Sequence, residues 1–223
     1  MIGIVDYNAG NIKSVERAMI SIGAPYIISK KPSELEKADT VIFPGVGEAS
    51  YAMGQLKKTG FDIFLKDWAQ AQKPLFGICL GSQIIFEFSE ENDTECLGLL
   101  KGKIRHIKNI WEDEAKSGKI NSIPDLKVPH MGWNNLTYSN GGSPIFNGVP
   151  EHSDFYFVHS YAIQPEDKTI IKASAEFGVQ IPSCVSCGSI TAFQFHPEKS
   201  GKNGLQILKN IAAIDSKNGG AEC

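Results

Sequence analysis

The sequence predicts an α/β fold in which a mostly parallel central sheet is flanked by helices, in a single domain. Short apolar runs of strand length alternate with segments of helical periodicity in the first half of the chain, which is typical of repeated β-α units. The chain has 223 residues, enough for one large buried core and few for two. We expect the domain to cover residues 1–214, and the polar, glycine-containing residues 215–223 to form a disordered tail.

The alternation is clearest in the first half. Strands are expected at residues 2–5, 26–28, 40–43 and 75–77, and helices at 12–22, 34–38, 48–57 and 61–72 and from Cys79 to about residue 88. Helical spacing of Ile12, Val15 and Met19 indicates the first helix, and Ser33 is the expected N-cap of the second. Functional loops of such sheets lie at the carboxyl ends of the strands.

The pattern changes in the second half. Strands are expected at residues 102–107, 156–159, 169–173 and 190–195, and a last helix at 203–214. Residues 111–126 are polar, and we expect them to form an irregular excursion from the domain.

Composition excludes several classes of function. The formal net charge of −3 argues against broad electrostatic binding to nucleic acid. No stretch approaches the roughly 18 apolar residues of a membrane span, and the segment after Met1 has no basic region, so we expect a cytoplasmic protein without a membrane partner. Five cysteines, an odd number, do not indicate a disulfide framework.

Cys79 stands between two glycines, Gly77 and Gly81, after one apolar run and before another. This spacing is typical of a tight turn from a strand into a helix. Such a turn exposes a nucleophile at the helix start, where backbone N–H groups and the helix dipole favour a thiolate. The motif predicts an enzyme that forms a covalent bond through Cys79.

A cysteine nucleophile needs a base, and the base needs an orienting acceptor. His196 ends a strand run, and Pro197 then bends the chain so that Glu198 can return toward the ring. These residues suggest a Cys79–His196–Glu198 triad. The alternative, that His196 is a structural histidine at a strand end, stays open on spacing alone.

Six motifs together resemble the class I (triad) glutamine amidotransferases, and within them the glutaminase subunits of imidazole glycerol phosphate synthase. They are residues 6–11, 44–47, 77–83, 129–134, 156–161 and 195–198. The resemblance covers about residues 1–214. It implies that Cys79 attacks the carboxamide of L-glutamine and forms a γ-glutamyl thioester, with His196 as general acid and base and Glu198 as its orienter.

The resemblance also implies roles for the surrounding residues. The oxyanion would be held by the backbone N–H of Leu80 and, after a loop adjustment, by one from the oxyanion loop Gly45, Val46 and Gly47. Glutamine would contact four further residues: Gln83, Glu91, Ser160 and Tyr161. No cofactor and no metal are implied.

The implied partner is the (β/α)8-barrel cyclase subunit of histidine biosynthesis, which receives ammonia through a channel in a heterodimer. Asn11 and Trp133 correspond to the face toward that barrel. The alternative for Trp133 is a core or lid aromatic.

Two departures from the family keep other partners open. Ser82 stands where the family commonly has Met, for which we expect modest repacking, and residues 109–127 look longer than usual. The long segment keeps open a paralogous glutaminase that feeds a sugar-modifying amidotransferase in surface-polysaccharide synthesis. A non-catalytic scaffold is a third hypothesis, against which the intact Cys79, His196 and Glu198 argue.

Cys184 and Cys187 have the spacing of a zinc or redox pair. A tetrahedral zinc site needs four ligands, and no second such pair or histidine cluster accompanies them. We therefore expect a plain β-turn between two strands there. No Lys-Ser/Thr pair closes a phosphate-binding loop, so no nucleotide site is expected.

Overall fold

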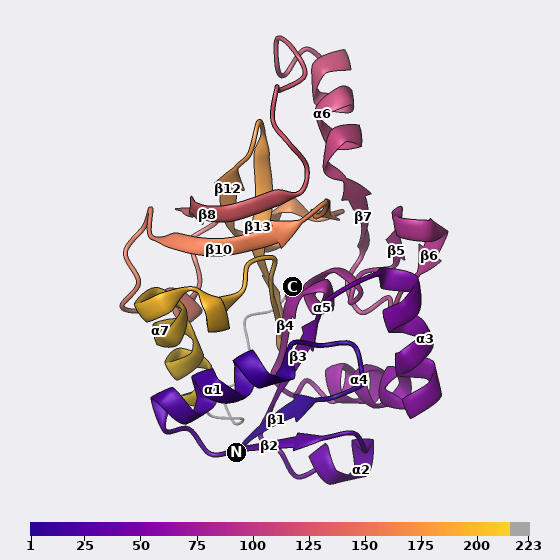
Figure 1. Cartoon of the computed structure of the whole chain (residues 1–223), viewed down its shortest axis with the longest axis vertical. Coiled ribbons are helices and arrows are strands. Elements are labelled where there is room, and N and C mark those ends of the chain that lie inside the picture. The colour runs from indigo at the N-terminus through magenta and orange to yellow at the C-terminus, as the bar shows by residue number, and fades with distance from the viewer. Residues whose placement is uncertain (215–223) are drawn as a thin grey trace.

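An eight-stranded mixed sheet forms the centre of the protein (Figure 1), in a computed structural model that describes residues 1–214. The order is β2-β1-β3-β4-β14-β13-β12-β9. In chain order the strands are β1 Ile2–Val5, β2 Tyr26–Ser29, β3 Thr40–Gly45, β4 Leu75–Cys79, β9 Thr137–Tyr138, β12 Ile171–Glu176, β13 Gln180–Cys187 and β14 Ile190–Phe193. The pairs from β2 to β14 are parallel and the remaining pairs are antiparallel. The α/β class is confirmed, and the tail expected at 215–223 lies outside the described residues.

Helices cover both faces of the sheet. They are α1 Ile12–Ile22, α2 Pro32–Leu35, α3 Ala49–Thr59, α4 Phe61–Gln70, α5 Leu80–Gln83, α6 Ile107–Lys116 and α7 Gly201–Ala212. Apolar side chains of α1 and α7 pack in one core cluster, and those of α3 and α4 pack in another. Figure 1 shows the two helix pairs on opposite sides of the sheet.

Two smaller sheets lie beyond the carboxyl ends of the parallel strands. One pairs β8 His130–Asn135 with β10 Asp154–His159. The other has the order β11-β7-β5-β6, with β5 Phe88–Ser89, β6 Thr94–Glu95, β7 Gly102–His106 and β11 Tyr161–Pro165. Residues 1–214 also contain four short 3-10 turns: η1 Glu91–Asp93, η2 Pro144–Phe146, η3 Lys168–Ile170 and η4 Pro197–Lys199.

The helix after Cys79 is shorter than the sequence predicts. It ends at Gln83, because the carbonyls of the next three residues accept hydrogen bonds from a distant loop rather than from their own helix. Leu97 N donates to Ile84 O at 2.9 Å, and Gly98 N donates to Phe86 O at 2.8 Å. The apolar run is buried as loop and not as the expected helix.

The start of α2 is also corrected. Lys31, and not Ser33, is the N-cap, and Pro32 is the first helical residue. Proline suits this position because its fixed φ matches the helix and its missing N–H would have no intrahelical acceptor there. Ser33 therefore lies inside the helix.

The excursion expected at 111–126 begins inside a helix instead. α6 has one buried face, formed by Ile107, Ile110 and Trp111, and polar residues on its other sides. The Trp111 Nε1–H donates to Phe177 O at 2.9 Å. The carboxylate of Glu90 ties the base of the helix to the domain by accepting from the side chains of Arg105 (2.8 Å) and Asn109 (2.9 Å). Figure 1 shows α6 projecting away from the main sheet.

The β-turn expected at Cys184 and Cys187 is wrong, because both residues lie within β13. Residues three apart in a strand point to opposite faces. Accordingly, Cys184 packs in the cluster of α1 and α7, and Cys187 packs against the cluster of α3 and α4. The two sulfurs cannot share a metal ion. Within residues 1–214, no group of three or more His, Cys, Asp or Glu side chains is placed to hold one.

No helix within residues 1–214 has the length and apolar character needed to cross a membrane.

Replacing Trp111 with alanine should lower the free energy of unfolding by about 3–5 kcal/mol, because it removes a fully buried side chain. Urea unfolding followed by circular dichroism measures the change. Glu112→Ala on the exposed side of the same helix is the control, with an expected change within about 0.5 kcal/mol. Equal losses in the two variants would show that the docked face of α6 contributes nothing specific.

Candidate active site

A cleft of about 340 Å³ lies at the carboxyl ends of β3 and β4. Its lining is formed by Val46, Gly47, Cys79, Leu80, Gln83, Glu91, Pro129, Val158, His159, Ser160, Tyr161, His196 and Lys199. Most residues expected at a glutaminase site are therefore brought together here. Four of them, Gly45, Glu198, Asn11 and Trp133, do not line the cleft.

Cys79 occupies a strained turn between β4 and α5. Its φ of +53° lies in the left-handed region that a non-glycine residue rarely adopts. The flanking glycines make the turn possible, since a Cβ on Gly77 would lie 2.9 Å from Gly81 O. The thiol is 7% exposed, and its Sγ lies 3.9 Å from Val158 O of β10.

His196 and Glu198 form a buried pair beside this turn. Pro197 begins the short turn η4, which brings the Glu198 carboxylate back so that its Oε1 lies 2.7 Å from His196 Nδ1. Burial lowers the pKa of His196, but the side chains of Cys79 and Glu198 together outweigh it and leave that pKa raised above its ordinary value. The side chains of Cys79 and Glu198 therefore stabilise the imidazolium that forms when the His196 ring accepts the thiol proton.

The His196 ring is fixed on the backbone side as well. His196 N donates to Tyr156 O at 2.9 Å, and the Ser200 hydroxyl donates to His196 O at 2.6 Å. Among residues 1–214, His196 Nε2 has no regular hydrogen-bond partner. That nitrogen is thus left available for a proton from a group in the cleft.

The oxyanion loop is in a resting arrangement. Leu80 is the first residue of α5, where helix geometry leaves the N–H without an intrahelical acceptor. The Val46 N–H, by contrast, donates to Ala9 O at 3.2 Å. Because that bond occupies the donor, Val46 can serve an oxyanion in the cleft only after its peptide rotates.

Residues expected to contact glutamine are held by bonds to the protein. The Gln83 Nε2 donates to Tyr161 O at 2.8 Å and to Gln194 Oε1 at 2.9 Å. Glu91 Oε2 accepts from Ala49 N at 2.7 Å, and burial raises the pKa of this carboxyl despite that bond. Gln83 therefore holds the wall of the cleft in place, while Glu91 presents an acidic group to it.

A histidine pair supports the same wall. His159 Nδ1 donates to Tyr161 O at 2.8 Å, which leaves Nε2 as the acceptor for His130 Nδ1 at 3.0 Å. His130 Nε2 in turn accepts from Asn134 Nδ2 at 3.1 Å. The His130 ring is stacked between Phe157 and Phe177, with centroid distances of 4.6 and 4.2 Å.

Four lining residues were not predicted as site residues from the sequence: Pro129, Val158, His159 and Lys199. The motif at 129–134 contains Pro129, the motif at 156–161 contains Val158 and His159, and Lys199 directly follows Glu198. Their position within or next to the matched motifs was the available signal. Which side chains of a strand face the cleft, however, depends on how that strand pairs in the fold.

Ser82 does more than repack. It is fully buried, and its hydroxyl donates to Cys79 O at 2.6 Å, which a methionine could not do. The hydroxyl thereby helps to hold the carbonyl of the strained residue.

Trp133 is 59% exposed on β8, which excludes the core alternative. Its ring meets Tyr156 edge to face at 6.1 Å, and Tyr156 lies 6.4 Å from the His196 ring. Asn11 directly precedes α1, and its carbonyl accepts from Ser14 N. Trp133 is thus a surface aromatic one side chain away from the buried histidine.

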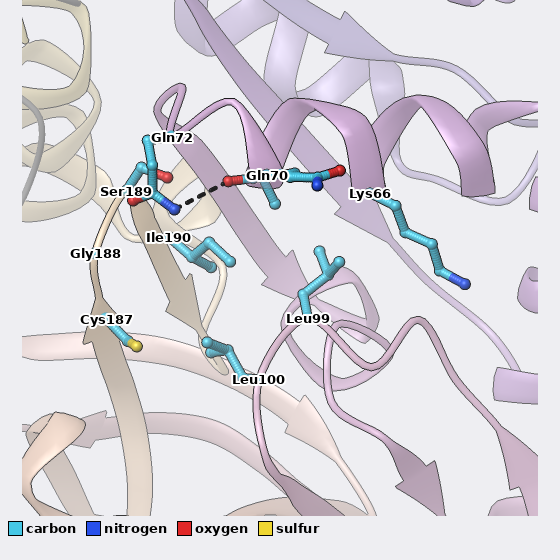
Figure 2. Close-up of a pocket in the computed structure, with 10 residues that line it drawn as sticks. Lys66, Gln70, Gln72, Leu99, Leu100, Cys187, Gly188, Ser189 and Ile190 are labelled. Carbon is cyan, nitrogen blue, oxygen red and sulfur yellow. Dashed lines mark hydrogen bonds between the residues drawn. The ribbon is translucent and has the colours of Figure 1, made fainter.

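A second and larger cavity, about 660 Å³, lies at the amino ends of β4 and β14 (Figure 2). Lys66 and Gln70 of α4, Ser189 of the β13–β14 turn and Ile190 of β14 contribute to its walls. Figure 2 shows no juxtaposed base and nucleophile among the drawn side chains. Size therefore does not identify the site, and the smaller cleft is the one that contains the candidate nucleophile and base, Cys79 and His196.

The family model described as glutamine amidotransferase class-I matches residues 3–214. The chain belongs to this family. Solved structures agree in fold: one described as a glutamine amidotransferase has a TM-score of 0.69 at 16% identity, covering 96% of this chain and 99% of its own. The structure of PurLQS from Thermotoga maritima has a TM-score of 0.65 at 19% identity, covering 94% of this chain and 96% of its own.

This amidotransferase has relatives of higher identity that share one description. The imidazole glycerol phosphate synthase subunit HisH of Halalkalibacterium halodurans is 42% identical over 218 residues, 97% of each chain. The subunit of the same name from Bacillus subtilis is 46% identical over 215 residues, 96% of each chain. The similarity is thus nearly full length in both directions.

Acidification from pH 6.5 toward pH 4 should lower the free energy of unfolding. Burial lowers the pKa of His130 to about 4 and that of His159 to about 3. Between these values and the ordinary 6.5 the unfolded chain binds protons that the folded chain does not, so each histidine contributes about 1.4 kcal/mol per pH unit. Urea unfolding at pH 7, 6 and 5 measures the slope.

The slope should become shallower in His130→Gln and stay unchanged in His152→Gln, which alters an exposed histidine. An unchanged slope in His130→Gln would mean that the pair is not the source of the acid sensitivity.

Proposed function

We propose that this chain is the glutaminase subunit of an imidazole glycerol phosphate synthase, which hydrolyses L-glutamine and delivers the ammonia to a cyclase subunit in histidine biosynthesis. One observation carries the proposal. A cysteine at a strained strand-to-helix turn shares a cleft with a buried imidazole whose other nitrogen is bound by a carboxylate. Membership of the amidotransferase family supports glutamine as the substrate.

In the first half-reaction, His196 takes the proton of the Cys79 thiol and the thiolate attacks the side-chain amide carbon of glutamine. Glu198 stabilises the imidazolium that forms. The tetrahedral intermediate collapses as the C–N bond breaks, and His196 returns its proton to the leaving nitrogen, which departs as ammonia. A γ-glutamyl thioester on Cys79 remains.

In the second half-reaction, His196 takes a proton from water and the resulting hydroxide attacks the thioester carbon. The C–S bond breaks, glutamate leaves, and the thiol regains its proton from His196. No cofactor enters either step, because both involve acyl transfer and proton transfer alone.

Both intermediates carry a negative oxygen that needs backbone donors. The Leu80 N–H, directly after Cys79 in the chain, is one donor that needs no rearrangement. A second donor requires that Val46 N–H leave Ala9 O. Gly45 and Gly47 flank this residue, and the absence of Cβ atoms lowers the cost of rotating the peptides there. We therefore expect the isolated chain to be a slow glutaminase that speeds up when its partner and ligand bind.

The partner we propose is the (β/α)8-barrel cyclase, docked over Asn11, Trp133 and the oxyanion loop. Ammonia stays uncharged and is retained only if the site is sealed from water, which a second subunit achieves. The HisH description of the relatives at 42% and 46% identity supports this partner over a sugar-modifying amidotransferase.

Cys79→Ala should abolish imidazole glycerol phosphate synthesis from glutamine while leaving synthesis from added ammonium intact in the complex with the cyclase. Only the ammonia source is lost, since the cyclase site is on the other subunit. Product formation with each nitrogen source measures both rates. Cys96→Ser is the control, because Cys96 lies outside the cleft and should retain glutamine-dependent synthesis.

Loss of the ammonium-driven rate in Cys79→Ala would show that Cys79 has a structural role in the complex. If the wild-type chain released glutamate and ignored the cyclase, the pathway assignment would fail and the surface-sugar partner would replace it.

Trp133→Ala should weaken binding of the cyclase at least tenfold, since a large exposed aromatic at an interface is a frequent binding hot spot. Isothermal titration calorimetry with the purified cyclase measures the affinity. Ile63→Ala, which removes an equally exposed apolar side chain on α4, should leave it unchanged. Equal affinities of the Trp133 variant and the wild type would remove Trp133 from the interface.

A further inference from the structure

Tyr7 carries a polar atom that the resting fold does not use. It lies two residues after the end of β1, and it is fully buried. Its hydroxyl has no hydrogen-bond partner among residues 1–214. An unpaired buried hydroxyl lowers stability relative to a phenylalanine of the same shape, so its presence calls for a function in another state.

The hydroxyl lies against the oxyanion loop. A Cβ added to Gly45 would lie 2.8 Å from Tyr7 Oη, 2.6 Å from Gly81 N and 3.0 Å from the carbonyl carbon of Leu80. Gly45 is therefore enclosed between the hydroxyl and the first turn of α5. Only a residue without a side chain fits between them.

The peptide joining Gly45 to Val46 is the one that must rotate. In the resting state its N–H is bound to Ala9 O, two residues beyond Tyr7. The N–H and C=O of a trans peptide point in opposite directions, so the Gly45 carbonyl now faces away from Ala9. Rotation that turns the N–H into the cleft turns this carbonyl toward residues 7–9, where it needs a donor.

We propose that Tyr7 is a positioning residue for the oxyanion loop: its hydroxyl donates to the Gly45 carbonyl once the Gly45–Val46 peptide has rotated, and so stabilises the conformation that accepts the oxyanion. The proposal rests on the glutaminase function proposed above. The hydroxyl is a ready donor, because burial and the nearby Cys79 raise the pKa of Tyr7 and keep it protonated. A bond made in one state alone shifts the population toward that state.

The test is Tyr7→Phe in the complex with the cyclase and its ligand. The kcat for glutamate release should fall about tenfold, as expected for the loss of one hydrogen bond made only in the active state. KM for glutamine and the affinity for the cyclase should stay at wild-type values, since both depend on other groups. The melting temperature should be unchanged or higher, because the resting fold loses only an unpaired hydroxyl.

Alkylation of Cys79 by iodoacetamide separates the loop from the nucleophile. Alkylation of the thiol forms no oxyanion, so the rate of alkylation should be the same in Tyr7→Phe and the wild type. The matched control is Tyr138→Phe, which removes a hydroxyl that donates to Val149 O at 3.0 Å. That variant should melt at a lower temperature and keep its kcat.

Wild-type kcat in Tyr7→Phe would overturn the proposal, and so would a lower melting temperature with slower alkylation, which would indicate a structural role. If the wild-type complex released no glutamate and Cys79 took no label from a glutamine-analogue electrophile, the glutaminase function itself would fail, and the role of Tyr7 with it. An active wild type beside an unaffected Tyr7→Phe rejects the role of Tyr7 alone.

Discussion

The strained backbone at Cys79 is the constraint on which the site depends. A non-glycine residue at positive φ costs on the order of 1–3 kcal/mol and persists only when its surroundings hold it there. β3 supplies one restraint, since Gly45 is paired with Cys79 in the parallel register. Ser82 supplies another by donating to the Cys79 carbonyl. The strained turn places the Cys79 thiol at the end of β4 and the Leu80 N–H at the start of α5. The carbonyl group of a substrate amide can reach both of them.

The other wall of the cleft is held by a separate set of interactions. Tyr161 O accepts from both Gln83 and His159, so one carbonyl joins the helix after the nucleophile to the β8–β10 sheet. His130 extends the chain of hydrogen bonds to Asn134, next to the exposed Trp133. The surface proposed for the partner and the wall proposed for the substrate are thus parts of one connected unit. A partner that shifts β8 has a physical route to the cleft.

Glycine and tyrosine together explain how the oxyanion loop could hold two conformations. The resting state satisfies the Val46 N–H through Ala9 and leaves the Tyr7 hydroxyl without a partner among residues 1–214. The rotated state proposed for catalysis reverses this arrangement, so that neither state satisfies every polar group. Two states that each lack one hydrogen bond differ by little in free energy, which suits the partner-dependent activity proposed above.

The local sequence pattern was sufficient to predict an element wherever the interactions that decide it lie close in sequence. α1 spans Ile12–Ile22 as expected, because its apolar spacing is a property of the segment itself. The turn at Cys79 was predicted from the glycines two residues before and after it. The approach of Glu198 to His196 was predicted from the proline between them. The four parallel strands of the first half were located to within two residues for the same reason.

The β-α alternation, the turn at Cys79 and the histidine–carboxylate pair could therefore be predicted from the sequence alone, since each is encoded over a few neighbouring residues. Tertiary structure alone decided that α5 stops at Gln83, that α6 is a docked helix, and that Cys184 and Cys187 face opposite ways. It also decided that the Val46 N–H is bound to Ala9. In each case the outcome depends on which distant group satisfies a backbone donor or covers an apolar face, and such partners leave no periodic signal in the segment they affect.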